Sequence, residues 1–297
     1  MTRELSGPGW DCLWPLGAEL GEGPIWDADN QRLWFVDIQA PAVHRFDPVS
    51  GAHDSWTPPW RIGSIALRAS GGLIAGTEDG FAAIDPEHGI FTLLDDPEAG
   101  PALASNRFND GKVDAHGMFW AGTMDETKLT RQGSLYRLGA DLGWSRSDAG
   151  YRISNGPAFS PDGHTLYHND TLDRITFALD VDAGGVLTNK RVLVVWPVAM
   201  GAPDGLTTDC EGYLWQTFWG GSCVRRVSPA GVVGAEYPLP VTNVTSCAFG
   251  GARLERLFVT TARQGLDAGA LAAQPLAGGL FEIFPGVTGC PGGVFAG

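Results

Sequence analysis

The chain has 297 residues, 43% of them hydrophobic, which is enough to bury a sizeable core within one domain. Its net charge of −14 at pH 7 argues against electrostatic binding to nucleic acid or to an anionic membrane. The 42 glycines and 20 prolines, together with 11 tryptophans and 14 phenylalanines, indicate short strands and tight turns rather than long helices.

The first residues, "MTRELSGPGWDCLW", lack the basic stretch and apolar run of a signal peptide. No apolar run approaches the ~18 residues that span a bilayer. The cysteines, Cys12, Cys210, Cys223, Cys247 and Cys290, are odd in number and have no CxxC spacing. Reduced thiols in a cytoplasmic protein are the simplest interpretation, with Cys210 and Cys223 as small buried residues.

One pattern recurs six times along the chain: a polar residue, a few small or apolar residues, a turn, and an aromatic-rich apolar run. The copies begin in chain order with "EGPIWD" at Glu22, "SIALRA" at Ser64, "NDGKVD" at Asn109, "NGPAFS" at Asn155, "DGLTTD" at Asp204 and "TSCAFG" at Thr245. When the copies are aligned, one turn position holds Gly72, Gly117, Gly163 and Gly212, with Asn30 in the first copy.

These copies begin 42, 45, 46, 49 and 41 residues apart, and each leaves room for four short strands. A period of this length is typical of a β-propeller blade. We therefore predict an all-β chain that forms a single six-bladed β-propeller over residues 1–297, and six aligned turns disfavour an open β-sandwich. The segment "DCLWPLGAEL", which precedes the first copy, is expected to supply the outer strand of the last blade and close the ring.

The six aligned polar residues are predicted to form a ring at one end of the central channel, because the first strand of each blade lines that channel. All six side chains carry oxygen: Glu22, Ser64, Asn109, Asn155, Asp204 and Thr245. Clustered carboxylates repel one another unless a cation compensates, and carboxylate and amide oxygens suit Ca²⁺, Mg²⁺ or Mn²⁺. The ring contains neither Cys nor His, which disfavours a structural zinc site. For Ser64 and Thr245 we favour a structural role in satisfying backbone groups.

Four segments together resemble the SMP-30/gluconolactonase (regucalcin-like) family, and its bacterial sugar lactonases in particular: "LGEGPIWDADNQRLWFVDI", "RFNDGKVDAHGMFWAGTM", "ISNGPAFSPDGHTLYHNDT" and "PDGLTTDCEGYLWQTFWGG". The resemblance implies a six-bladed propeller with one divalent metal ion (Ca²⁺, Mn²⁺, Zn²⁺ or Fe²⁺) at the channel mouth. It also implies that Glu22, Asn155 and Asp204 are the metal ligands, and that Arg107 and Asn109 face the substrate.

The activity implied is hydrolysis of an aldono-1,4- or 1,5-lactone to the aldonic acid in sugar catabolism. The metal would polarise the lactone carbonyl and stabilise the developing oxyanion. Asp204 is the expected general base, and because a ligated carboxylate is a weak base, a metal-held hydroxide is the rival account. Arg107 would donate hydrogen bonds to the lactone, and Asn109 would bind substrate or metal-held water. The motifs indicate neither the lactone nor the oligomeric state.

Two other function classes stay open: a phosphotriesterase or arylesterase-type propeller, and a non-catalytic calcium-binding propeller. The former usually needs a second, deeper calcium ion, whereas the sequence shows one acid-bearing ring. After "AGTM", Asp125 and Glu126 are shifted by one position relative to the acidic pair of some relatives, and they are expected to form a solvated turn. His116 is expected to be exposed in a turn, and His168 to be packed rather than catalytic.

Overall fold

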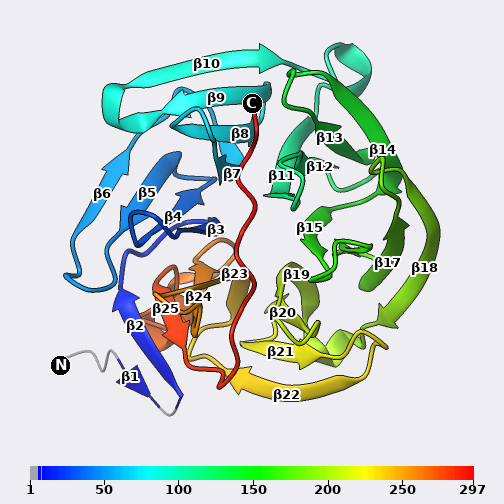
Figure 1. Ribbon diagram of the computed structural model, residues 1–297. Coiled ribbons are helices and arrows are strands. Elements are labelled where there is room, and N and C mark those ends of the chain that lie inside the picture. Colours follow the sequence, from blue (N-terminus) through cyan, green and yellow to red (C-terminus); the bar gives the residue numbers. More distant parts are fainter. Residues whose placement is uncertain (1–5, 8) are drawn as a thin grey trace.

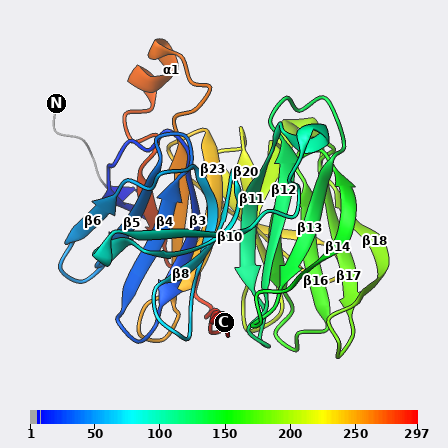
Figure 2. The same ribbon diagram turned by 90° about the horizontal axis from the view of Figure 1, so that it is seen from above.

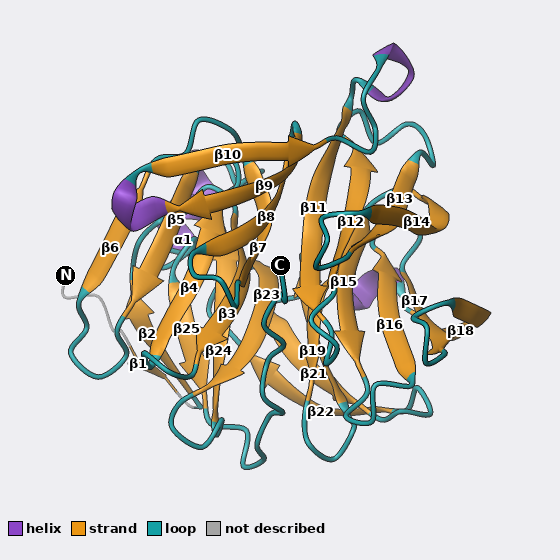
Figure 3. Ribbon diagram, turned by 45° about the horizontal axis from the view of Figure 1, so that its top comes forward, coloured by secondary structure: helices purple, strands orange, loops and turns teal. Residues whose placement is uncertain are grey.

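The computed structural model describes residues 6–7 and 9–297, whose strands form six sheets arranged around a common axis (Figure 1). The predicted all-β six-bladed propeller is confirmed. Helical segments are short and lie between strands (Figure 3). They are η1 (Pro86–His88), η2 (Pro101–Leu103), η3 (Val198–Met200) and α1 (Ala268–Ala273). No helix among the described residues is long and apolar enough to cross a membrane.

The first five blades each contain four consecutive strands, which follow one another from the axis outward. Blade 1 consists of β3 (Gly21–Asp27), β4 (Arg32–Asp37), β5 (Ala42–Phe46) and β6 (His53–Trp56). Blade 2 consists of β7 (Ile62–Leu67), β8 (Leu73–Thr77), β9 (Gly80–Asp85) and β10 (Ile90–Asp95). Blade 3 consists of β11 (Asn106–Val113), β12 (Phe119–Asp125), β13 (Gly133–Leu138) and β14 (Trp144–Tyr151).

The remaining blades complete the ring. Blade 4 consists of β15 (Ser154–Phe159), β16 (Thr165–Asp170), β17 (Ile175–Val181) and β18 (Leu187–Val195). Blade 5 consists of β19 (Ala202–Thr208), β20 (Leu214–Trp219), β21 (Cys223–Val227) and β22 (Val233–Pro238). Blade 6 joins both ends of the chain, with β23 (Asn243–Gly250), β24 (Arg256–Ala262), β25 (Leu280–Ile283), β2 (Trp10–Trp14) and β1 (Ser6–Gly7).

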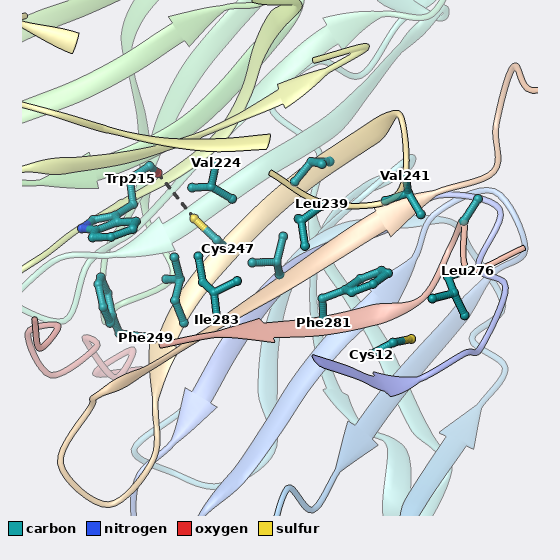
Figure 4. Close-up of a cluster of buried hydrophobic side chains, with 14 residues drawn as sticks. Cys12, Trp215, Val224, Leu239, Val241, Cys247, Phe249, Leu276, Phe281 and Ile283 are labelled. Atoms are coloured by element: carbon teal, nitrogen blue, oxygen red, sulfur yellow. Dashed lines mark hydrogen bonds between the residues drawn. The ribbon is translucent and has the colours of Figure 1, made fainter. Parts of the chain in front are cut away.

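The ring closes where β2 pairs antiparallel with β25, with Asp11 opposite Glu282 and Cys12 opposite Phe281. The predicted closure by the N-terminal segment is therefore confirmed, although the strand covers only Trp10–Trp14 of that region and β1 extends the sheet beyond it. Figure 4 shows Cys12 and Phe281 within a hydrophobic cluster that extends from blade 6 to Trp215 in blade 5. The closing strand is thus held by backbone pairing and by apolar packing.

How deeply each strand is buried depends on its position in the blade. β8 and β12 are buried along their whole length, because both faces of a blade pack against neighbouring blades near the axis. The outer strands β10 and β22 are mostly exposed. The buried indoles of Trp120 and Trp215 donate Nε1–H to Asp114 and Asp209 at 2.8 and 2.9 Å, so these two acids, which directly follow β11 and β19, serve packing.

The aligned turns behave largely as the repeat predicts. The four turn glycines have left-handed φ angles of 69°, 79°, 73° and 86°, a region that favours glycine: Gly72, Gly117, Gly163 and Gly212. In the first copy Asn30 lies in the turn as predicted, and the left-handed residue is the next one, Gln31, with φ 53°.

Residues 284–297, which we call the C-terminal strap, cross the axis at the end opposite α1 (Figures 1 and 2). Backbone bonds join the strap to blade 6 through Gly289 N–H and Leu254 O at 2.9 Å, and to blade 2 through Phe295 N–H and Leu67 O at 2.8 Å. The Phe295 ring is fully buried. Because each inner strand begins at the α1 end, the strap covers the end of the axis away from the polar ring.

Replacing Phe295 with Ala should lower the melting temperature by roughly 10 °C, because truncating a buried phenylalanine costs about 3–5 kcal/mol. Val294 lies beside it and is 44% exposed, so Val294→Ala is the matched control and should melt within a degree or two of wild type. Thermal denaturation of the three proteins measures both effects. Equal melting temperatures for the two variants would show that the strap contributes nothing to stability.

Candidate active site

The structure places all six ring residues near the start of the inner strands, where they are between 0% and 7% exposed. They are Glu22 on β3, Ser64 on β7, Asn109 on β11, Asn155 on β15, Asp204 on β19 and Thr245 on β23. Each inner strand contacts the next one around the axis, and β23 contacts β3 to complete the circle. The sequence alignment therefore identified residues that surround one end of the axis, which we call the site end.

A break in strand register occurs at the ring position of every inner strand. In β3 the pairing with β4 shifts between Glu22 and Ile25, and in β11 the pairing with β12 shifts between Phe108 and Gly111. The other four inner strands shift at or beside their ring residue as well. A β-bulge interrupts the alternation of side chains and redirects them locally. The bulges therefore let consecutive residues of one strand reach the same interior region.

Asp110 is the residue that the sequence analysis missed for this reason. It is buried next to Asn109, and its Oδ2 accepts a hydrogen bond from Gly156 N–H in blade 4 at 2.9 Å. Strict alternation would turn Asp110 away from the side that Asn109 faces. Its only sequence signal was its place directly after a ring residue in "RFND".

The site end gathers three buried carboxylates. Burial raises the pKa of Glu22 well above its ordinary value, and the charges of Asp204 and Asp110 raise it further. The pKa of Asp204 is raised by burial and then by Asp110, and burial raises the pKa of Asp110 to about 6. Desolvated like charges of this kind are compensated by a cation or by protonation.

Hydrogen bonds connect the amide side chains of the ring. Asn109 Nδ2 donates to Asn155 Oδ1 at 2.9 Å and to Ser154 O at 2.9 Å. Asn155 Nδ2 donates to Thr171 Oγ1 at 2.7 Å, which leaves its oxygen on the side of Asn109. Arg107 Nη1 donates to Asn109 Oδ1 at 2.8 Å. The structure thus brings Arg107, Asn109 and Asn155 into one chain of contacts.

The donors present fit a divalent cation. Glu22 Oε2 accepts a hydrogen bond from the backbone N–H of Gly23 at 3.1 Å, and the Asp204 carboxylate accepts one from the backbone N–H of Gly205. Each acid is therefore hydrogen-bonded to its own strand. Ser64 Oγ is buried and has no hydrogen-bond partner among the described residues. No three His, Cys, Asp or Glu side chains of the described chain form a metal-binding group, so a three-ligand site also needs the Asn155 amide.

The two hydroxyl-bearing ring residues differ in their roles. Thr245 Oγ1 donates to Gly21 O at 2.5 Å, which bears out the expected structural role between blades 6 and 1. The same expectation for Ser64 was wrong, because its hydroxyl satisfies no backbone group of the described chain.

Lys112 is a second interior residue that the sequence analysis passed over. Its Nζ donates to Leu206 O at 2.9 Å, in blade 5. Burial lowers the pKa of Lys112, and the Asp110 carboxylate opposes that change. Lys112 and Asp110 therefore compensate each other's charge beneath the ring.

The expected solvated turn at Asp125 and Glu126 was wrong. Asp125 is 1% exposed, and its Oδ2 accepts from Thr127 Oγ1 and Thr130 Oγ1 at 2.6 Å each, which holds the turn. Glu126 Oε1 accepts from Arg107 Nε at 3.1 Å. Its two oxygens also accept from Arg61 Nη1 and Nη2 at 2.7 and 2.8 Å. No sequence signal marked Arg61, because 65 positions separate it from this partner.

The remaining side chains with catalytic chemistry lie apart from the ring. His116 is exposed, as expected. His168 is fully buried, its Nε2 is 2.9 Å from Ser154 Oγ, and burial lowers its pKa to about 3. Cys223 is buried as predicted, but Cys210 is exposed, because the turn that carries it lies at the strap end.

Comparison with known proteins gives consistent results. Residues 20–263 match a family model described as the SMP-30/gluconolactonase/LRE-like region. A 6-deoxy-6-sulfogluconolactonase of Pseudomonas putida is 35% identical over 96% of this chain and 98% of its own length. Regucalcin of Bos taurus is 37% identical over 95% of this chain and 96% of its own length. A crystal structure of regucalcin from Agrobacterium tumefaciens, described as a calcium-binding protein, has a TM-score of 0.91 at 30% identity and covers 97% of each chain.

The buried acids predict a pH-dependent stability in metal-free protein. Because the pKa of Asp204 is raised above 3.8, the folded state holds a proton that the unfolded state releases, so stability falls as pH rises from about 4 toward neutrality. Asp204→Asn removes this loss and should be more stable than wild type at pH 7, with the difference vanishing near pH 4.

Thermal melts of EDTA-treated wild type and Asp204→Asn across this pH range measure the effect. Added Ca²⁺ should make wild type melt at a higher temperature than Asp204→Asn at pH 7, because the ion binds wild type alone. Parallel pH profiles for the two proteins would contradict the assignment of Asp204 to a desolvated acid cluster.

Proposed function

This chain belongs to the SMP-30/gluconolactonase/LRE-like family, and we propose that it hydrolyses a sugar lactone, an aldono-1,4- or 1,5-lactone, to the aldonic acid in a metal-dependent reaction. The observation that carries the proposal is the cluster of buried oxygen donors at the site end, where acids from three blades gather at the ring that also holds the Asn155 amide. The family relatives named as lactonase and as calcium-binding protein support the two halves of the proposal.

We assign the metal to Glu22, Asn155 and Asp204. The ion, whether Ca²⁺, Mn²⁺, Zn²⁺ or Fe²⁺, would supply Lewis acidity toward the lactone carbonyl and neutralise the carboxylates. Thr171 and Asn109 orient the Asn155 amide from its two sides, so the ligand oxygen is held before the ion binds. Such preorganisation reduces the cost of binding.

Arg107 is the proposed substrate-binding residue. Its Nη1 and Nε atoms are occupied by Asn109 and Glu126, whereas its Nη2 makes no hydrogen bond within the described chain. That group is available to donate to the lactone carbonyl or a ring hydroxyl, where a charged donor stabilises developing negative charge. Both amide atoms of Asn109 are engaged, so we assign it mainly to orienting Arg107 and Asn155 beside the substrate.

Asp204 is the proposed general base. Its carboxylate would accept a proton from the water that attacks the lactone carbonyl. The C–O ester bond then breaks, and Asp204 returns the proton to the leaving oxygen, which gives the acid and a free hydroxyl. Burial raises the pKa of Asp204 when no cation is bound, and a bound cation would lower that pKa, so Asp204 would be a weaker base as a metal ligand than as a free acid. No histidine competes for this role at the ring, because His168 lies outside it and contacts Ser154.

The non-catalytic alternative keeps one specific observation in its favour, since the Agrobacterium relative is described as calcium-binding. An arylesterase or phosphotriesterase activity would use the same donors on another ester. A cytoplasmic location and a place in sugar catabolism stay predictions from the sequence.

The test is a pH-indicator assay of acid release from a panel of aldonolactones. EDTA-stripped protein should be inactive and should regain turnover of one lactone class with Ca²⁺, Mn²⁺, Zn²⁺ or Fe²⁺. A protein that binds metal but hydrolyses no lactone or aryl ester above the spontaneous rate would be a binding propeller. Turnover of aryl or phosphate esters alone would favour the esterase alternative.

Two variants test the roles assigned to Asp204 and Arg107 in this assay. Asp204→Ala should abolish metal-restored turnover while the protein still folds, and wild-type activity would remove Asp204 from the mechanism. Arg107→Ala should lower kcat/KM by about 100-fold while calorimetry shows the metal still bound. Loss of the metal in Arg107→Ala would mean that Arg107 supports the ion rather than the substrate.

A further inference from the structure

Two arginines stand at the site end, and carboxylates pair with both. Arg61 Nε donates to Glu78 Oε2 at 2.6 Å, and its two Nη atoms donate to Glu126. Arg107 Nε donates to the same Glu126 carboxylate at 3.1 Å. The guanidinium groups therefore meet two carboxylates, and their combined charge is balanced before any substrate arrives.

The rest of the site end offers no unpaired positive charge. Asp110 and Lys112 compensate each other, and a divalent cation would compensate Glu22 and Asp204. Beside Arg107 lies a cavity of about 330 Å³. Of the described residues that line it, four are carboxylates and Arg107 is the one cation: Glu78, Asp79, Asp96 and Glu98 are the acids. An anionic group that enters this region meets no unpaired cation.

We propose, on the basis of the lactonase function above, that Glu126 and Arg61 determine specificity by setting how far the positive charge of Arg107 is compensated, so that the site selects uncharged polyhydroxy lactones over lactones bearing a phosphate, sulfonate or carboxylate. Glu126 acts on the reaction through Arg107, because it sets how much positive charge Arg107 presents to the substrate. Arg61 has the opposite effect. It compensates part of the negative charge of Glu126, which would otherwise compensate Arg107 alone. The hydroxyls of a neutral lactone still find donors and acceptors there.

The experiment compares kcat/KM for glucono-1,5-lactone and for 6-phosphoglucono-1,5-lactone, which differ at C6. Wild type should prefer the neutral lactone by at least about tenfold. Glu126→Gln should shift that ratio toward the phosphorylated lactone by about tenfold, because it leaves the arginines with one uncompensated charge. Arg61→Met should shift it the other way, so the pair of variants gives a result even if one fails to fold.

Glu236→Gln is the matched control, because Glu236 pairs with Arg225 at 2.7 Å on the outer strands of blade 5 and its loss changes net charge equally. Its substrate ratio should stay at the wild-type value. A wild-type preference for the phosphorylated lactone, or an equal loss of both activities in Glu126→Gln, would overturn the specificity role and leave lactonase activity intact. Turnover of neither lactone by wild type, with no other lactone accepted, would instead reject the proposed function itself.

A second, independent observation concerns the opposite end of the axis. Cys210 Sγ lies 3.3 Å from Cys290 Sγ, across 80 positions of sequence. The backbones are held together at the same place, since Cys210 N–H donates to Thr288 O at 2.9 Å and Asp209 pairs with Gly289. Cys210 is exposed, and Cys290 is partly exposed. Cys290 belongs to the C-terminal strap, whereas Cys210 belongs to the first turn of blade 5.

We infer that Cys210 and Cys290 are a redox modification site that forms a disulfide and fastens the C-terminal strap to blade 5. With a small-molecule disulfide such as oxidised glutathione, the Cys210 thiolate attacks one sulfur and releases one glutathione. The Cys290 thiolate then attacks the mixed disulfide and releases the second. Two protein thiols lose two protons and two electrons, and the oxidant takes them up. Burial raises the pKa of Cys290 to about 12, so the second step should be faster at alkaline pH.

The test treats the folded protein with oxidised glutathione and maps its peptides by mass spectrometry. A Cys210–Cys290 cross-link should form and raise the melting temperature by several degrees, because it closes a loop of 80 positions. Cys290→Ser should lose both effects, and Cys223→Ser, which removes a buried thiol elsewhere, should retain them. A Cys210–glutathione adduct that never resolves, or a cross-link with another cysteine, would overturn the inference.

Discussion

Every feature of the site end depends on the closure of the ring by β2 against β25. Once the last blade is completed by the first strand of the chain, the six inner strands have no freedom to spread, and their starting residues must share one interior region. Gly63 shows how close this approach is, because a Cβ atom at that position would collide with the Asn109 carbonyl oxygen. A residue with any side chain there would displace the strand that carries Asn109. Closure therefore converts a linear repeat into a ring of buried polar groups.

Burying these acids costs free energy, and they differ in how far hydrogen bonds offset that cost. Glu98 is also buried, but it accepts hydrogen bonds from Asn106, Thr123 and Tyr136, which partly offset the rise in its pKa. For Glu22 only the backbone N–H of Gly23 and the charge of Arg107 offset the rise in pKa, and for Asp204 only the backbone N–H of Gly205 does so. A carboxylate left so poorly satisfied is what a site for an added cation requires, and a purely structural acid would resemble Glu98.

The features that could be predicted from the sequence are those that recur at a fixed spacing. The repeat period predicted the blades, and counting back from the turn found the ring, because each inner strand begins at the same distance from its turn. Asp110 could not be found this way, since a β-bulge adds it to the interior against the strand period. Arg61 and Glu126 meet only because blades 2 and 3 are neighbours, and Cys210 meets Cys290 only because the strap crosses the axis. Contacts between distant segments leave no local pattern in one sequence.

A continuous chain of hydrogen bonds runs from the rim to the candidate metal ligand, through Arg61, Glu126, Arg107, Asn109 and Asn155. Each link uses a donor on one side and an acceptor on the other, so the orientation of the Asn109 amide is fixed by its two neighbours. Charge at the rim and ligand geometry at the ion are therefore not independent properties. On the specificity proposed above, a substitution at Glu126 or Arg61 would change substrate choice only within the limits set by Asn109. Substitution at the rim that reversed this amide would turn an acceptor toward Asn155 in place of a donor, and it would then act on the metal site rather than on substrate choice.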